Sequence, residues 1–169
     1  YISEAYKELG DEDKALEYNQ QYMDKNPNAA PTDFMKLAEI YVNKAKKDPA
    51  KKIENIDKAI GVYAKLAEKY PTLKPFAKLQ EGNTAFQNEL DDKAIAAYTE
   101  VINELEAKQC DEDELSYLKT SYQYMGFIYT YDKQDFNTAK PYWDKLLKLD
   151  PQNKLANDAY EKAGLKPGE

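Results

Sequence analysis

The sequence predicts an all-α protein, built as a solenoid of stacked antiparallel helix pairs. Apolar residues recur every three or four positions along most of the chain, which is typical of amphipathic helices. One short pattern also returns four times, and internal repeats of this length indicate a stacked architecture. The pattern is an alanine, followed in three cases by an aromatic residue four positions later: Ala15, Ala59 with Tyr63, Ala94 with Tyr98, and Ala139 with Trp143.

Each repeated alanine lies in a segment that has the features of the second helix of a pair. Proline follows three of these segments, at Pro27, Pro71 and Pro151. The residue before a proline is pushed out of the α conformation, so the helices should end there. The clearest apolar stripe consists of Ile53, Ile56, Ile60, Tyr63, Leu66 and Tyr70.

A further amphipathic segment precedes each alanine and supplies the first helix of the pair. In the last unit its spaced positions are Tyr122, Met125, Gly126 and Tyr129, and the small residue lets a second helix approach closely. In the second unit they are Phe34, Leu37, Ala38 and Tyr41. The third unit keeps Gly82 but places Lys78 and Glu81 at apolar positions, and the first unit supplies only Ile2, Ser3 and Tyr6.

Together these positions resemble the tetratricopeptide repeat (TPR), whose pattern combines a small residue, a tyrosine, an alanine, an aromatic residue and a proline at fixed spacing. The resemblance implies a right-handed α-solenoid of about four TPR-like units, the first of them truncated, and a C-terminal capping helix. We expect one domain over 1–169, with units at roughly 1–27, 31–71, 74–107 and 112–151 and the capping helix at 153–163.

The two ends of the chain differ in this interpretation. "YISEAYKELG" has the pattern of the latter part of a first helix, so we expect the chain to be the C-terminal part of a longer TPR-containing protein. At the other end, Leu155, Ala159 and Ala163 are expected to point inward from the capping helix, with Gly164 at its end.

The spacing of the alanines predicts two extended connections of opposite charge. The intervals are 59 − 15 = 44, 94 − 59 = 35 and 139 − 94 = 45, against a period of about 34. We expect the extra residues to lengthen the flanking helices by more than a turn. The basic connection carries Lys44, Lys46, Lys47, Lys51 and Lys52, and the acidic one carries Glu104, Glu106, Asp111, Glu112, Asp113 and Glu114.

Composition excludes several classes of function. The net charge of −7 repels nucleic acid and anionic membrane surfaces, and no run of about 18 apolar residues predicts a membrane span. There is no histidine, every basic residue is lysine, and Cys110 is the single cysteine. We therefore expect no catalytic residues, no cofactor and no metal site, since EF-hand spacing from Asp111 also lacks its glycine. The compartment, cytoplasmic or exported, stays open.

The resemblance to TPR proteins implies that a partner's peptide or helix binds along the concave surface of the first helices. Helical phase predicts outward positions there with a mixture of apolar and amide groups. They are Met35, Glu39, Val42 and Asn43 in the second unit, Leu79, Asn83 and Phe86 in the third, and Gln123, Phe127, Thr130 and Tyr131 in the fourth.

A non-catalytic interaction module of unidentified partner is thus the leading hypothesis. The alternative is a structural spacer or self-assembly arm, with weak self-association through the oppositely charged connections. The third hypothesis is the regulatory domain of an enzyme whose chemistry lies in another part of the protein.

Overall fold

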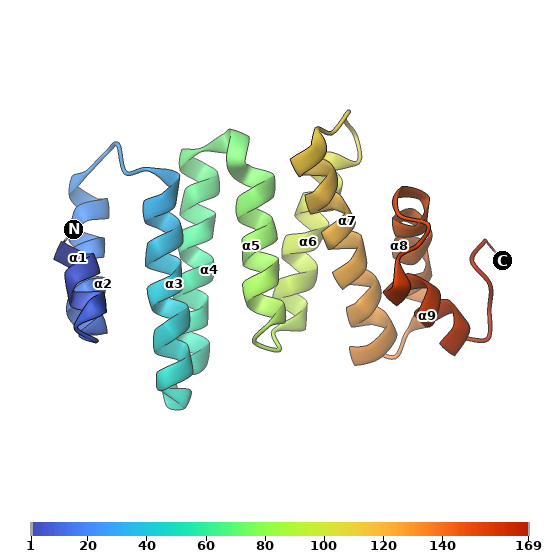
Figure 1. Cartoon of the computed structure of the whole chain (residues 1–169), viewed down its shortest axis with the longest axis horizontal. Helices are drawn as coiled ribbons and strands as arrows, with labels where there is room; N and C mark the ends of the chain where they lie inside the picture. Colours follow the sequence, from blue (N-terminus) through green and yellow to red (C-terminus); the bar gives the residue numbers. More distant parts are fainter. Residues whose placement is uncertain (1, 169) are drawn as a thin grey trace. The chain divides into compact units, whose positions relative to one another are not determined.

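The computed structural model describes residues 2–168, with the side chains of 2–4, 12 and 24 outside the description. The chain forms two compact units, residues 1–90 and 91–169, which we describe separately. Every regular element among the described residues is helical (Figure 1), so the all-α prediction is confirmed. The side chains of Ile2 and Ser3, which the repeat pattern uses, are not among those described. That the chain is one domain with four repeats of the stated bounds stays a prediction.

Unit 1 consists of successive helices that pack in order along the chain, as Figure 1 shows. Helix α2 packs against both α1 and α3, and α4 packs against both α3 and α5. Asp11 begins α2 by accepting a hydrogen bond from the Lys14 N–H, and Gly10 makes the preceding turn at a φ of 75°. The helices are α1 (Ile2–Glu8), α2 (Glu12–Lys25), α3 (Pro31–Lys47), α4 (Lys52–Lys69) and α5 (Lys74–Phe86), with short 3₁₀ turns η1 (Pro49–Lys51) and η2 (Pro71–Leu73).

The core of unit 1 follows the predicted stripes. Phe34, Leu37 and Tyr41 of α3 meet Tyr63 and Leu66 of α4 in one buried cluster. Helix α4 ends at Tyr70, immediately before Pro71, as the proline rule predicts. Ile53 departs from the expected stripe, since it lies exposed in the first turn of α4.

The extra residues between Ala15 and Ala59 lengthen two helices, as predicted. Helix α3 has 17 residues and α4 has 18, whereas α5 has 13. Each is therefore longer than α5 by at least one turn of about 3.6 residues. The basic connection lies at the tip that these longer helices form.

Unit 2 contains the remaining helices, and the acidic connection differs from its prediction. Helix α6 stops at Leu105 and α7 starts after Asp111, so residues 106–111 are not helical. The Asp111 carboxylate accepts from the Glu114 N–H, and the Glu114 carboxylate accepts from the Asp111 N–H. This capping box fixes a new helix start there and prevents a continuous extension. The helices are α6 (Asp91–Leu105), α7 (Glu112–Phe127), α8 (Phe136–Leu149) and α9 (Lys154–Lys162), and a π-helical turn, η3 (Ile128–Asp132), follows α7.

Trp143 is the centre of the unit 2 core. Its side chain is fully buried, and it lies directly against the Gly126 backbone of α7. A Cβ atom at Gly126 would be only 2.5 Å from Trp143 Cε2, so glycine is required for this helix contact. The Trp143 indole N–H also donates to Thr130 Oγ1 at 2.9 Å.

The inward face of α9 differs in part from the expectation. Ala159 is buried as predicted, but Leu155 is 38% exposed and Ala163 is also exposed. The buried residues are Ala156, Ala159 and Tyr160, so the stripe shares only Ala159 with the predicted one. Gly164 ends the helix at a φ of 71°, as expected.

Candidate functional site

The predicted binding residues of α3 form a face with little exposed apolar surface. Met35 and Val42 pack against the edge of the unit 1 core, and Asn43 is half-buried. Glu39 is exposed and forms an ion pair with Lys7 of α1 at 2.8 Å. Sequence reasoning missed this pair, because Lys7 and Glu39 are distant in the chain. Both side chains remain about half exposed, so the pair contributes little stability and a charged partner can replace it.

The residues predicted on α5 separate into two groups. Asn83 and Phe86 are half-buried, whereas Leu79 is only 6% exposed. The prediction that Leu79 faces outward is therefore wrong. Helix α5 buries positions on two adjacent sides, among them Ala77 and Ala85, so its phase does not identify one outer face.

The two charged residues at apolar positions of α5 form an ion pair with each other. Lys78 Nζ lies 3.1 Å from Glu81 Oε2, and both side chains are largely buried. A buried charge is tolerated when an opposite charge compensates it. The two departures from the repeat pattern therefore depend on each other.

In unit 2, helix α9 covers part of the predicted face of α7. Gln123 Oε1 accepts a hydrogen bond from Asn153 Nδ2 at 3.3 Å, and the Lys162 ammonium lies 4.7 Å from the centre of the Tyr131 ring. Tyr131 also packs against Phe127, with ring centres 4.8 Å apart. The capping helix thus already contacts two of the four residues predicted to bind a partner.

Thr130 lies in the π turn, where it is half-exposed and lines an open hollow of about 430 Å³ together with Tyr131 and Lys162. Thr130 Oγ1 accepts the Trp143 indole hydrogen bond, so the side chain points toward α8. The Lys133 N–H donates to the Ile128 carbonyl oxygen at 2.9 Å, a spacing of five residues in place of four. The wider turn rotates the residues after Phe127 relative to the phase that a regular α-helix would give them.

Two carboxylates of the acidic connection form ion pairs with lysines within unit 2. Glu106 pairs with Lys145 at 2.5 Å and accepts a hydrogen bond from the Tyr122 hydroxyl. Glu114 pairs with Lys108 at 2.6 Å. Burial and the neighbouring Glu106 carboxylate both raise the pKa of Tyr122.

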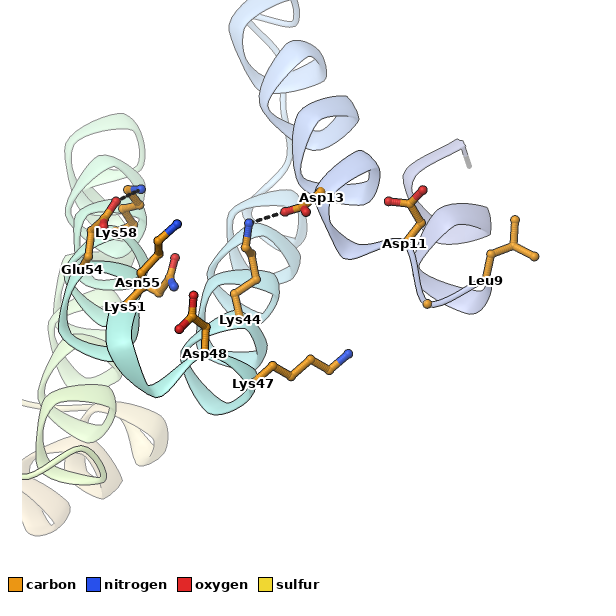
Figure 2. A pocket seen from close by; sticks show the side chains of 11 residues that line it. Leu9, Asp11, Asp13, Lys44, Lys47, Asp48, Lys51, Glu54, Asn55 and Lys58 are labelled. Carbon is orange, nitrogen blue, oxygen red and sulfur yellow. Dashed lines mark hydrogen bonds and ion pairs between the residues drawn. The ribbon is translucent and has the colours of Figure 1, made fainter.

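The basic connection forms one side of an open hollow of about 650 Å³ in unit 1, drawn in Figure 2. We call it the Asn55 hollow. The α1–α2 turn, the end of α3 and the start of α4 line it with Leu9, Gly10, Asp11, Asp13, Lys44, Lys47, Asp48, Lys51, Glu54, Asn55 and Lys58.

Ion pairs and a helix cap occupy several of the charges around the hollow. Lys44 pairs with Asp13 across the α2–α3 interface at 2.5 Å, and Lys58 pairs with Glu54 at 2.5 Å. The hydrogen bond from Lys58 lowers the pKa of Glu54. The Asp48 carboxylate accepts from the Ala50 N–H and begins η1.

Asn55 differs from the other residues that line the hollow. It is only 5% exposed, yet no described residue donates to or accepts from its side-chain amide. Its amide lines the open hollow. Asn55 was not selected from the sequence. It could have been noticed as an amide that directly precedes Ile56, a residue of the buried stripe of α4.

The described residues also contain no membrane-spanning helix and no metal-binding cluster. No helix in that part of the chain has the length and apolar content required to cross a bilayer. Within the same residues, no cluster of three or more carboxylate or thiol side chains is positioned to hold a metal ion.

Comparison with known families agrees with the repeat pattern. No curated protein matches the chain significantly. The tetratricopeptide repeat model matches residues 1–29 and 34–72, which contain α1, α2, most of α3 and α4. These are the helices whose packing, small residues and terminal prolines follow the repeat described above. Residues 1–29 and 34–72 of this chain therefore carry tetratricopeptide repeats.

Proposed function

We propose that this chain is a non-catalytic interaction module that binds a peptide or helix of a partner protein through the first helices of its pairs. Tetratricopeptide repeats generally mediate protein–protein interactions, which supports the class of function. The observation that carries the proposal here is the α3 face. Met35 and Val42 offer apolar contacts, Asn43 offers an amide, and Glu39 is held only by an exposed ion pair.

In this proposal, unit 1 supplies the main contact through α3 and through Asn83 and Phe86 of α5. Within unit 2, taken by itself, the half-buried rings of Phe127 and Tyr131 are the proposed contacts. Gln123, Leu79 and Thr130 have smaller roles, since each is buried or already bonded within its own unit. Aromatic anchors with amide neighbours are the side chains that dominate binding energy in such interfaces.

The test is partner capture with the full chain and two matched double variants. The variant Asn43→Ala with Phe86→Ala removes one amide and one ring from the proposed face. The control, Lys65→Ala with Glu68→Ala, changes exposed residues of α4. A partner identified by mass spectrometry should be retained by the control and lost from the first variant, provided that circular dichroism shows both to be folded. Equal retention by both variants would contradict the proposal.

A structural or self-assembly role is the second candidate, and the opposite charge of the two connections is its support. Exposed Lys46 and Lys51 carry one sign, and exposed Glu112 and Asp113 carry the other. Pairing of Glu106 and Glu114 within unit 2 reduces the charge that remains for a second copy. Sedimentation across a salt series tests this role: it requires association that salt weakens, and a monomer at every salt concentration excludes it.

A further inference from the structure

We propose that the Asn55 hollow binds an extended acidic segment of a partner polypeptide, as a second site separate from the α3 face. The hollow lies at the tip of the α3–α4 pair, and all the residues that line it belong to unit 1. Figure 2 shows its two sides: Lys51, Glu54, Asn55 and Lys58 come from η1 and α4, and Lys44 faces them from α3.

Asn55 is the group that indicates a ligand. The residue is only 5% exposed, its amide points into the hollow in Figure 2, and the amide has no hydrogen-bond partner among the described residues. An asparagine side chain both donates and accepts hydrogen bonds. A peptide group of an extended chain presents the same two functions, so one backbone unit of a ligand satisfies the donor and the acceptor of Asn55 together.

Four lysines and four carboxylates line the hollow, and the position of Lys51 among them favours a carboxylate of the ligand. Lys51 has no ion-pair partner among the described residues, and it lies one turn before Asn55 at the start of α4. The positive end of the helix dipole adds to its field. The Lys44 pair is easily exchanged, because Asp13 is 85% exposed and a ligand carboxylate can take its place.

The other lining residues favour a peptide over a free phosphate or a nucleic acid. Asp11, Asp13, Asp48 and Glu54 bring four carboxylates to the same hollow. They repel a compact multiple charge such as phosphate, whereas a peptide distributes single carboxylates between neutral backbone groups. Leu9, which is 79% exposed at the rim, offers an apolar contact to a side chain of such a peptide.

The test uses the full chain, labelled with ¹⁵N, and a capped pentapeptide of alternating glutamate and leucine as the probe. Two further probes isolate the chemistry: the same peptide with glutamine in place of glutamate, and inorganic phosphate alone. Amide spectra should show saturable shifts of the Asn55 side-chain amide and of Lys51 and Leu9 with the acidic peptide. The glutamine peptide should bind about tenfold more weakly, since it lacks the charge that pairs with Lys51.

Two variants and one control link these shifts to the hollow. Asn55→Leu removes the amide at similar volume, and the variant should fold, because the Asn55 side chain makes no hydrogen bond to the described residues. Asn55→Leu and Lys51→Gln should each lower the affinity for the acidic peptide by about tenfold. Lys46→Gln, an exposed lysine of α3 outside the hollow, should leave the affinity unchanged.

Four results would overturn the proposal: no saturable shift with any probe, equal weakening by Lys51→Gln and Lys46→Gln, the same shifts with phosphate alone, or shifts confined to Met35, Val42 and Asn43. The last result would place the peptide on the α3 face and would support the proposed function at the expense of this site. Shifts at the hollow without any at α3 would support the Asn55 hollow as a binding site. The proposed function of the α3 face would then be decided by the partner-capture experiment.

Discussion

Replacement of Gly126 by alanine tests the close contact between α7 and α8. The new Cβ atom would lie 2.5, 2.6 and 2.9 Å from three ring atoms of Trp143, whereas unstrained carbon atoms are about 3.5–4.0 Å apart. The ring is fully buried and held by its hydrogen bond to Thr130, so it has little freedom to move.

The expected loss of stability follows from three opposing effects. Overpacking costs about 1–3 kcal/mol, and a broken indole hydrogen bond costs about 1 kcal/mol more. The better helix propensity of alanine returns about 1 kcal/mol. The free energy of unfolding of Gly126→Ala should therefore fall by about 1–3 kcal/mol.

Gly61 of α4 provides a matched control for this prediction. No atom lies within 4 Å of a Cβ built there, so Gly61→Ala should gain about 0.5–1 kcal/mol from helix propensity alone. Urea unfolding, followed by circular dichroism and by the fluorescence of Trp143, measures both variants. If Gly126→Ala were as stable as the unmodified chain, or gained stability as Gly61→Ala should, the close-contact explanation would be refuted.

Three further predictions concern the core and the helix starts of unit 2. Trp143→Ala should lower the free energy of unfolding by about 3–5 kcal/mol in urea titrations, since it empties the centre of the core, and a loss below about 1 kcal/mol would contradict this. Asp111→Ala should cost about 1 kcal/mol by loss of the α7 cap, whereas Glu112→Ala, a neighbour outside the capping box, should cost far less. The side-chain and backbone hydrogen bonds of Thr138 lower the pKa of Asp135. Because the folded-state pKa lies below the unfolded one, this carboxylate stabilises the fold above the unfolded pKa of about 3.9, and its contribution disappears as pH falls through the folded pKa. In the variant Thr138→Val, the pKa of Asp135 should return toward its ordinary value, as measured by NMR titration. An unchanged pKa would exclude the Thr138 hydroxyl as the main cause.

Sequence patterns identified the helix pairs because each pair depends on short-range rules. Trp143 follows Ala139 by one turn on the same buried face, and Pro71 ends α4 where it was expected to. Asp11 and Asp111 cap α2 and α7, as acidic residues before a helix predict. These rules need only the neighbours in the chain, so a single sequence was sufficient for them.

The binding face was predicted less well, because it depends on contacts between distant segments. The hydrogen bond of Thr130 to Trp143 was not predicted, since a π turn cannot be recognised from apolar spacing. The outward position of Leu79 was wrong, since α5 buries residues on two adjacent sides. The Lys7–Glu39 pair and the Asn55 hollow each join residues from different helices. Their charges were visible in the sequence, but their proximity was not.

The π turn after α7 also lets unit 2 accommodate one additional residue between the two helices of its pair, which the repeat pattern alone does not suggest. From Gly82 to Ala94 the chain advances 94 − 82 = 12 positions, and from Gly126 to Ala139 it advances 139 − 126 = 13. The single additional residue is absorbed inside the wide turn of 128–132, so Ala139 and Trp143 still reach their buried positions. An insertion that would otherwise displace a whole helix is thereby confined to one backbone turn.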